Sequence, residues 1–130
     1  MSSLISAFNK HFEEFVEDIL NVFPDNVDLM TAKNSLNLVK KNNPKILIKI
    51  WLAYIVIPYR EHIDAGDINF FLVKDYKEDV KNAENSDKIM ESINRLRTPI
   101  QQMSKDNQSK SMKYIQNLSK ISILYQSQKP

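Results

Sequence analysis

The hydrophobic pattern of this chain is most concentrated from Ile46 to Ile57, where apolar side chains occupy almost every position. A helix of this composition is apolar nearly all round, and such a helix has to be surrounded by other helices. We therefore predict a buried central helix over residues 43–66. We expect a bend between Tyr54 and Pro58, because the proline removes a helical hydrogen bond and crowds the preceding turn.

Capping residues predict where the central helix begins and ends. Asn43 suits the N-cap position, and Pro44 suits the first helical position, where a proline is tolerated. Gly66 is the only glycine in the chain and is expected as the left-handed residue after the last turn. The polar residues before it, among them Arg60 and Asp64, indicate that this end of the helix leaves the core.

Two amphipathic helices are predicted before the central one. The first covers residues 3–23, and its apolar positions recur at spacings of three and four: Leu4, Phe8, Phe12, Phe15, Ile19 and Val22. Pro24 ends it, because the residue before a proline disfavours the helical conformation. Asp25 is then the expected N-cap of a second helix that ends at about Lys41. The packed face of this helix is expected to consist of Leu29, Ala32, Leu36 and Val39.

The second half of the chain is also predicted to be helical. Asp67 can cap a short helix that contains Ile68 to Val73, and residues 74–85 are expected to form a loop or a weak helix. Apolar residues then follow at spacings of 4, 3, 4 and 3, as in a short coiled-coil seam: Ile89, Ile93, Leu96, Ile100 and Met103. Pro99 interrupts this helix, and the polar residues 104–111 are interpreted as a turn.

These elements predict an all-α fold, a compact bundle of five to six helices around a buried, proline-kinked central helix. Residues 1–80 are expected to form the helical core. Residues 81–130 are expected to form a helical hairpin or one long bent helix in the same domain. A chain of 130 residues suits one domain, and a single glycine, far below the usual share of about 7%, favours helices.

A membrane span or a signal peptide is not expected. The longest uncharged run, Ile50 to Tyr59, has ten residues, whereas a spanning helix needs roughly 20. The N-terminus lacks the basic start of a signal peptide. Without cysteine the chain has neither disulfides nor thiolate metal sites, which is compatible with a reducing compartment.

Candidate catalytic and metal-binding residues are few. His11 lies one helical turn from Glu14, and His62 has Glu61 and Asp64 close by. Each histidine could supply one edge of a metal site, but solvated polar faces explain these residues better. The acidic residues further along lack the spacing and the glycine of a calcium loop. We therefore predict no enzyme, no cofactor, no bound metal and no small-molecule substrate.

Charge is distributed unevenly along the chain. Residues 1–80 carry nine Lys and Arg against twelve Asp and Glu, a net charge of −3. Residues 81–130 carry nine against four, a net charge of +5. This asymmetry admits a nucleic-acid or other acidic partner, since each neutralised phosphate releases counterions. The alternative is an ordinary solvated face, because neither a helix-turn-helix signature nor an aromatic stacking platform accompanies the lysines.

The last helix is the candidate partner-binding surface. Its apolar stripe consists of Tyr114, Leu118, Ile121 and Tyr125, and the lysines off this stripe are Lys110, Lys113 and Lys120. The helix could therefore pack by one side and meet a partner by the other. We expect the apolar stripe to be a partner or self-association surface, because Pro99 and the polar segment 104–111 weaken the connection to the first 80 residues.

Several short motifs lie in the first part of the chain: FPDN at Phe23–Asn26, TAKNSL at Thr31–Leu36, NP at Asn43 and Pro44, Trp51, and IDAGDINFFLVKDY at Ile63–Tyr76. In these motifs the chain resembles small uncharacterised helical proteins of large nucleocytoplasmic DNA viruses, the giant viruses. The order Gly-Asp-x-x-Phe-Phe followed by Lys-Asp-Tyr is the most specific part. The resemblance implies a viral origin and a location in the host cytoplasm or the virion. It brings no assigned activity and no site residues.

The expected function is therefore that of a non-enzymatic viral structural or protein-protein interaction protein, such as a virion or assembly component. The alternative is a nucleic-acid-binding accessory protein that uses the basic C-terminal helices.

Overall fold

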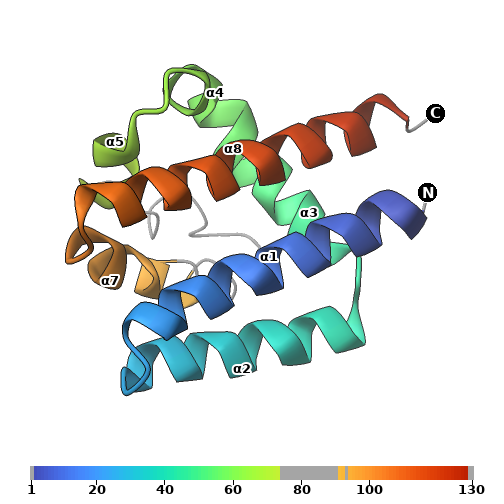
Figure 1. Ribbon diagram of the computed structural model, residues 1–130. Coiled ribbons are helices and arrows are strands. Elements are labelled where there is room, and N and C mark those ends of the chain that lie inside the picture. Colours follow the sequence, from blue (N-terminus) through green and yellow to red (C-terminus); the bar gives the residue numbers. More distant parts are fainter. Residues whose placement is uncertain (1, 74–90, 93, 129–130) are drawn as a thin grey trace.

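Two long helices, α1 (Ser2–Val22) and α8 (Lys105–Ser127), lie side by side and run in opposite directions (Figure 1). Helix α2 (Val27–Asn42) lies on the other side of α1, so α1 is the middle helix of the three. The computed structural model describes residues 2–73, 91–92 and 94–128, and every regular element in these ranges is helical. The predicted all-α helical bundle is confirmed.

Helix α2 begins one residue later than the sequence suggested. Asn26, and not Asp25, is its N-cap, and the Asn26 side-chain oxygen accepts a hydrogen bond of 3.0 Å from the backbone N–H of Leu29. Both residue types are good N-caps, and the one whose side chain reaches the N–H three positions ahead takes the role. The packed face of α2 is the predicted one, with Leu29, Ala32 and Leu36 buried.

The central helix is built from three consecutive segments: α3 (Ile46–Trp51), the π-helical turn η1 (Leu52–Val56) and α4 (Ile57–Asp64). It begins at Ile46, so the predicted N-cap at Asn43 is wrong. Asn43 has extended backbone angles (φ −148°, ψ 90°) and ends α2, donating its N–H to the carbonyl of Val39 at 2.9 Å. Its side-chain oxygen accepts from the N–H of Lys45 at 3.3 Å, which shapes the turn between the two helices.

The irregular part of the central helix coincides with the predicted bend. The N–H of Ile57 donates to the carbonyl of Leu52, five residues back, which is the hydrogen bond of a π turn. Pro58, in the first turn of α4, has no N–H to donate, and Tyr59 has non-helical angles (φ −126°, ψ 23°). The proline is therefore accommodated by widening the turn before it and kinking the turn after it.

Gly66 ends α4 as predicted. Its φ is +69°, and the N–H groups of Gly66 and Asp67 donate to the carbonyls of Ile63 and His62, each at 3.0 Å. This pair of bonds is a Schellman motif. Asp67 then caps α5 (Ile68–Val73), since its carboxylate accepts from the N–H of Phe70 at 3.3 Å.

Helix α8 is longer than predicted. Ser104 is its N-cap, with its hydroxyl oxygen accepting from the N–H of Asn107 at 3.2 Å, so the helix begins at Lys105. The interpretation of residues 104–111 as a turn is wrong, because a polar segment behind a good cap forms a solvated helical turn. Ahead of it, α7 (Arg97–Gln101) contains Pro99 and begins after Leu96, whose carbonyl accepts a hydrogen bond of 3.3 Å from the N–H of Ile100.

Some predictions fall on other parts of the chain. The loop or weak helix at residues 74–85 and the seam residues Ile89 and Ile93 lie outside the described residues. Of the other seam residues, Leu96 and Ile100 are buried and Met103 packs against the core.

One hydrophobic core joins both halves of the chain. Trp51 of the central helix is 3% exposed and lies against the rings of Phe8 and Phe12 of α1, with ring centroids 6.2 and 5.8 Å away. On the other side, α8 contributes Met112, Ile115 and Leu118, all buried. Trp51, which lies in the middle of the predicted central helix, is therefore a core residue.

Candidate functional site

The apolar stripe of α8 is part of the core. Leu118 is 0% exposed and Tyr125 is 6% exposed, while Tyr114 and Ile121 are half-buried and pack against the core cluster. The prediction that these four residues form a partner surface is therefore wrong for the folded chain. The stripe faces the core because α8 packs antiparallel along α1.

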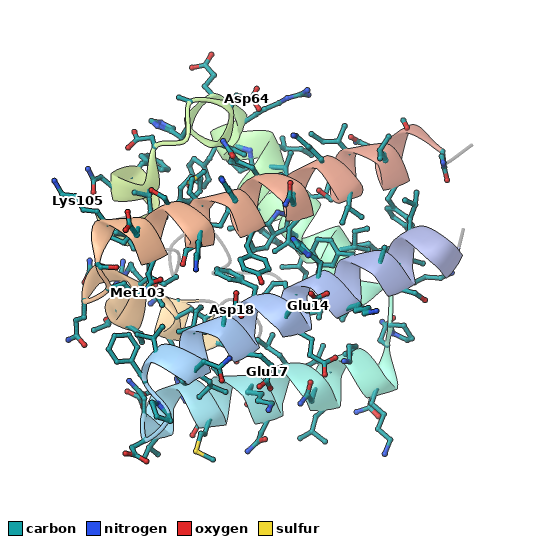
Figure 2. The ribbon with its side chains drawn as sticks, viewed as in Figure 1. Glu14, Glu17, Asp18, Asp64, Met103 and Lys105 are labelled. Atoms are coloured by element: carbon teal, nitrogen blue, oxygen red, sulfur yellow. The ribbon has the colours of Figure 1, made fainter. Side chains whose placement is uncertain are left out.

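The lysines of α8 face solvent. We call Lys105, Lys110, Lys113 and Lys120 the basic face of α8, and all four are exposed. Asp106 is the exposed acid on the same helix, and acidic residues of α1 lie alongside. Figure 2 shows Asp18 on the α8 side of α1 and Glu17 on the α2 side. The positive charge of the basic face is therefore partly balanced by its neighbour.

Tyr114 ties α8 to α1. Its hydroxyl donates to the carboxylate of Asp18 at 2.7 Å, and its ring stacks on Phe15 with a centroid distance of 5.2 Å. His11 lies on another side, 4.8 Å from the Tyr114 ring. The hydrogen bond to Asp18, together with partial burial, raises the pKa of Tyr114 to about 12. A phenol that keeps its proton this firmly serves as a hydrogen-bond donor between the helices.

A cavity of about 210 Å³ lies beside this pair. Phe15 and Ile19 of α1 and Met103 before α8 provide apolar walls, and Lys110 with Asp18 provides opposite charges among the lining residues. Tyr114 and Lys110 are thus the two predicted contact residues that the structure brings to one hollow. The Asp18 carboxylate that lines the hollow accepts the hydrogen bond from the Tyr114 hydroxyl.

The histidines considered for metal binding have other surroundings. His62 stacks on Phe70 with ring centroids 3.7 Å apart, and its Nδ1 lies 3.3 Å from a carboxylate oxygen of Asp67. Across the ranges that the structure describes, no group of three or more His, Cys, Asp or Glu side chains is arranged to hold a metal ion.

The surface that sequence reasoning missed lies on α2. We call Val27, Met30, Thr31, Asn34, Leu38 and Lys41 the outer face of α2, and all six are exposed. Three of them are large apolar side chains: Val27 is 73% exposed, Met30 50% and Leu38 63%. The signal was present in the sequence, because these residues are apolar yet lie off the stripe of Leu29 and Leu36.

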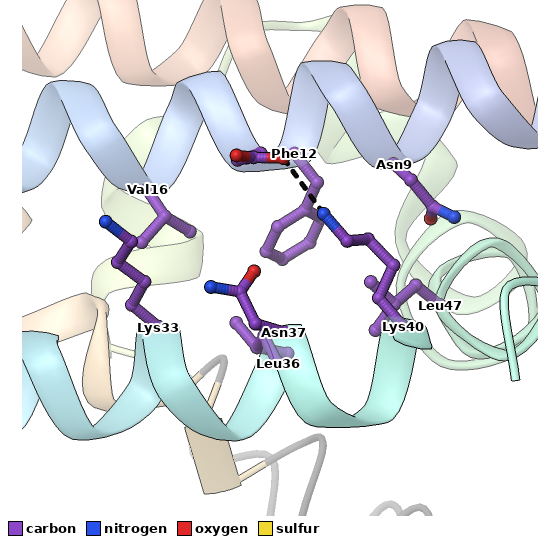
Figure 3. Close-up of a pocket in the computed structure, with 9 residues that line it drawn as sticks. Asn9, Phe12, Val16, Lys33, Leu36, Asn37, Lys40 and Leu47 are labelled. Atoms are coloured by element: carbon purple, nitrogen blue, oxygen red, sulfur yellow. Dashed lines mark hydrogen bonds and ion pairs between the residues drawn. The ribbon is translucent and has the colours of Figure 1, made fainter. Parts of the chain in front are cut away.

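The inner side of α2 is held to α1 by ion pairs around a small hollow (Figure 3). Lys40 donates to Glu13 at 2.9 Å, which lowers the pKa of that carboxyl through the hydrogen bond and the opposite charge, and Lys33 pairs with Glu17. The hollow between them measures about 20 Å³, which is room for about one water molecule. In these pairs Lys33 and Lys40 point toward α1 and away from the outer face of α2.

No family model, curated protein or solved structure matches this chain. The viral resemblance therefore stays a prediction. Among the helices described, none combines the length and apolar character needed to cross a bilayer.

Proposed function

We propose that this chain is a non-enzymatic protein-protein interaction protein, a structural or assembly component, and that the outer face of α2 is its contact surface. The observation that carries the proposal is the exposure of Val27, Met30 and Leu38 on a helix whose opposite face is buried. Single exposed apolar residues are normal on soluble proteins. Three on one face of a 16-residue helix form a patch of the kind that marks interaction sites.

Within the described ranges of the chain, the buried side chains and the ion pairs of α2 lie outside this patch. The packing of α2 on α1 and α3 uses Leu29, Ala32 and Leu36, and its ion pairs to α1 use Lys33 and Lys40. Leu38 belongs neither to these packing residues nor to these ion pairs. An apolar side chain left mostly in water loses the stabilisation of about 1.5–3 kcal/mol that full burial would give, and a partner could supply that burial.

The viral resemblance supports a class of protein and a location for the proposed function. Its motifs, from Phe23 to Tyr76, include residues of α2 and the end of α4. They support a virion or assembly component, found in the host cytoplasm or the particle, as the class of structural protein.

A pair of photo-crosslinking variants tests this function. A photoreactive residue at Leu38 is expected to give discrete protein adducts in cells that make the chain. The same residue at Lys113, which is exposed on α8, provides the matched control. Adducts from Lys113 with none from Leu38 would contradict the assignment of the contact surface to α2.

The second candidate function is that of a nucleic-acid-binding accessory protein. The basic face of α8 supports it, because four lysines share the exposed side of one 23-residue helix. Such binding would weaken steeply with salt, since it depends on the release of counterions from phosphates. A gel shift with mixed DNA and RNA at two salt concentrations tests this. The variant with Lys110, Lys113 and Lys120 replaced by glutamine is expected to lose the shift if this function holds.

A further inference from the structure

The outer face of α2 has the spacing of a helix-pairing seam. Val27, Thr31, Asn34, Leu38 and Lys41 follow one another at intervals of 4, 3, 4 and 3, and all are exposed. This is the repeat by which one helix packs along another. The hydroxyl of Thr31 is already bonded to the carbonyl of Val27 at 2.9 Å, so covering this position would leave no hydroxyl proton unpaired.

Two pairs of residues on the outer face of α2 lie at equal distances from Asn34. Met30 and Leu38 each lie four residues from Asn34, and Val27 and Lys41 each lie seven residues from it. Two copies of the helix packed antiparallel around Asn34 would therefore place Leu38 of one copy opposite Met30 of the other. A two-fold interface requires such self-complementarity, because the same patch serves both partners.

The charges at the two ends of α2 favour an antiparallel second copy. Asp25 and Asp28 are exposed at the N-terminal end, and Lys41 and Lys45 are exposed at the C-terminal end. Antiparallel pairing brings the acidic end of one copy next to the basic end of the other, whereas parallel pairing would place like charges together. The helix dipoles also oppose one another favourably in the antiparallel arrangement.

We infer that this protein self-associates as a two-fold dimer through the outer face of α2, with the two copies of α2 antiparallel and the axis beside Asn34. The inference rests on the proposed function and names its partner as a second copy of the chain. A buried asparagine at the centre of a helix pair fixes register, and Asn34 has that role here. Helix α2 is about 24 Å long, so the interface is small and the dimer is in the weak, reversible class.

Sedimentation velocity over protein concentrations from about 1 to about 500 μM, the range suited to a weak interface, tests this inference. The wild-type mass is expected to rise from 15.2 kDa toward twice that value. Leu38→Lys is expected to weaken the dimer about tenfold or more, since it replaces a large apolar side chain of the seam by a charge. Leu124→Lys is the matched control, because Leu124 is a similarly exposed leucine, 52% exposed, on α8.

Orientation is tested by introduced cysteines, since the chain has none of its own. Asn34→Cys is expected to form a disulfide-linked dimer under mild oxidation, because a residue at the two-fold axis meets its own copy. Val27→Cys is expected not to do so, because its counterpart lies at the other end of the pair. Equal cross-linking of both variants would indicate parallel helices and overturn the antiparallel arrangement.

The outcomes separate this inference from the proposed function. A wild-type chain that stays monomeric at every concentration overturns self-association, and protein adducts from Leu38 would then still support a different protein partner. Loss of the dimer in Leu124→Lys but not in Leu38→Lys would place the interface on α8 and overturn the inference. A monomer without protein adducts at Leu38 would remove both proposals.

Discussion

The indole Nε1 of Trp51 donates a hydrogen bond of 3.0 Å to the hydroxyl oxygen of Ser119, 68 positions further along the chain. The same hydroxyl donates to the carbonyl of Ile115 at 2.7 Å, and both Trp51 and Ser119 are buried. One serine of α8 therefore satisfies the only polar atom of the indole inside the core.

Ser119→Ala is expected to lower the free energy of unfolding by about 1–3 kcal/mol, because it leaves a buried indole N–H without an acceptor. Urea denaturation measures this loss. Ser122→Ala is the matched control, since Ser122 is fully buried but its hydroxyl donates to the carbonyl of Ser119 within the same helix. We expect a smaller loss in the control. Trp51→Ala, which also removes the ring, is expected to cost about 3–5 kcal/mol.

Gly66→Val is expected to destabilise the chain by about 1–2 kcal/mol, because a β-branched residue is strained at the left-handed φ of +69°. Space is not the reason, since an added Cβ would lie 3.6 Å from the side-chain nitrogen of Gln116, an ordinary contact. Gly66→Asn is expected to cost less, as asparagine tolerates this conformation. Thermal melts that place all three chains at the same midpoint would refute the left-handed cap.

The hydrogen bond between Tyr114 and Asp18 predicts a pH dependence at alkaline pH. The pKa of Tyr114 is about 12 in the folded chain and about 10 in the unfolded chain, so the folded state holds the proton more firmly. The stabilisation is therefore complete below pH 10 and is lost as the pH rises through 12. Ultraviolet titration should find that Tyr114 ionises at a pH of about 12 in the wild type. In Asp18→Asn its pKa should move back toward 10.

A chain that ends at Ser104 is expected not to melt cooperatively. The truncation removes Met112, Ile115 and Leu118 from the core, and each large apolar residue lost from a core costs about 2–5 kcal/mol. Circular dichroism over temperature measures the outcome. A chain that ends at Gln126 is the control, because it keeps these residues. A folded, cooperatively melting chain without α8 would restore the view of this helix as a separate surface element.

The parts of the fold that could be predicted are those where the local pattern decides the structure. Most of the central stretch is apolar, so the burial of Trp51, Ile48 and Ile55 followed from composition. The stretch is not buried all round, however, because Lys49, Ala53 and Ile57 lie on an exposed side of the helix. Gly66 and Asp67 were predictable because only a few residue types suit their backbone roles. Adjacent candidate N-caps were harder to tell apart. The N-cap of α2 is Asn26, one residue after the predicted Asp25.

The candidate site could not be predicted for a different reason. The stripe around Leu118 and the outer face of α2 around Leu38 both have apolar residues at helix-pairing intervals. Which of the two is covered depends on the order of helices in space, with α8 on one side of α1 and α2 at the edge of the bundle. Spacing along the sequence does not determine that order, so the sequence could not show that the stripe around Leu118 is the one that is covered.

The π turn at Leu52–Val56 has a consequence for how the length of this chain can vary. Such a turn holds one residue more than an α-helical turn, and each residue of an α-helix advances about 100° around the axis. Deleting a single residue there would restore a regular helix but rotate everything after it. Ile63, buried and bonded through its carbonyl to the side chain of Gln116 at 2.9 Å, would turn away from α8. In related chains, we expect gaps and insertions to fall in the connections between helices and to avoid this turn.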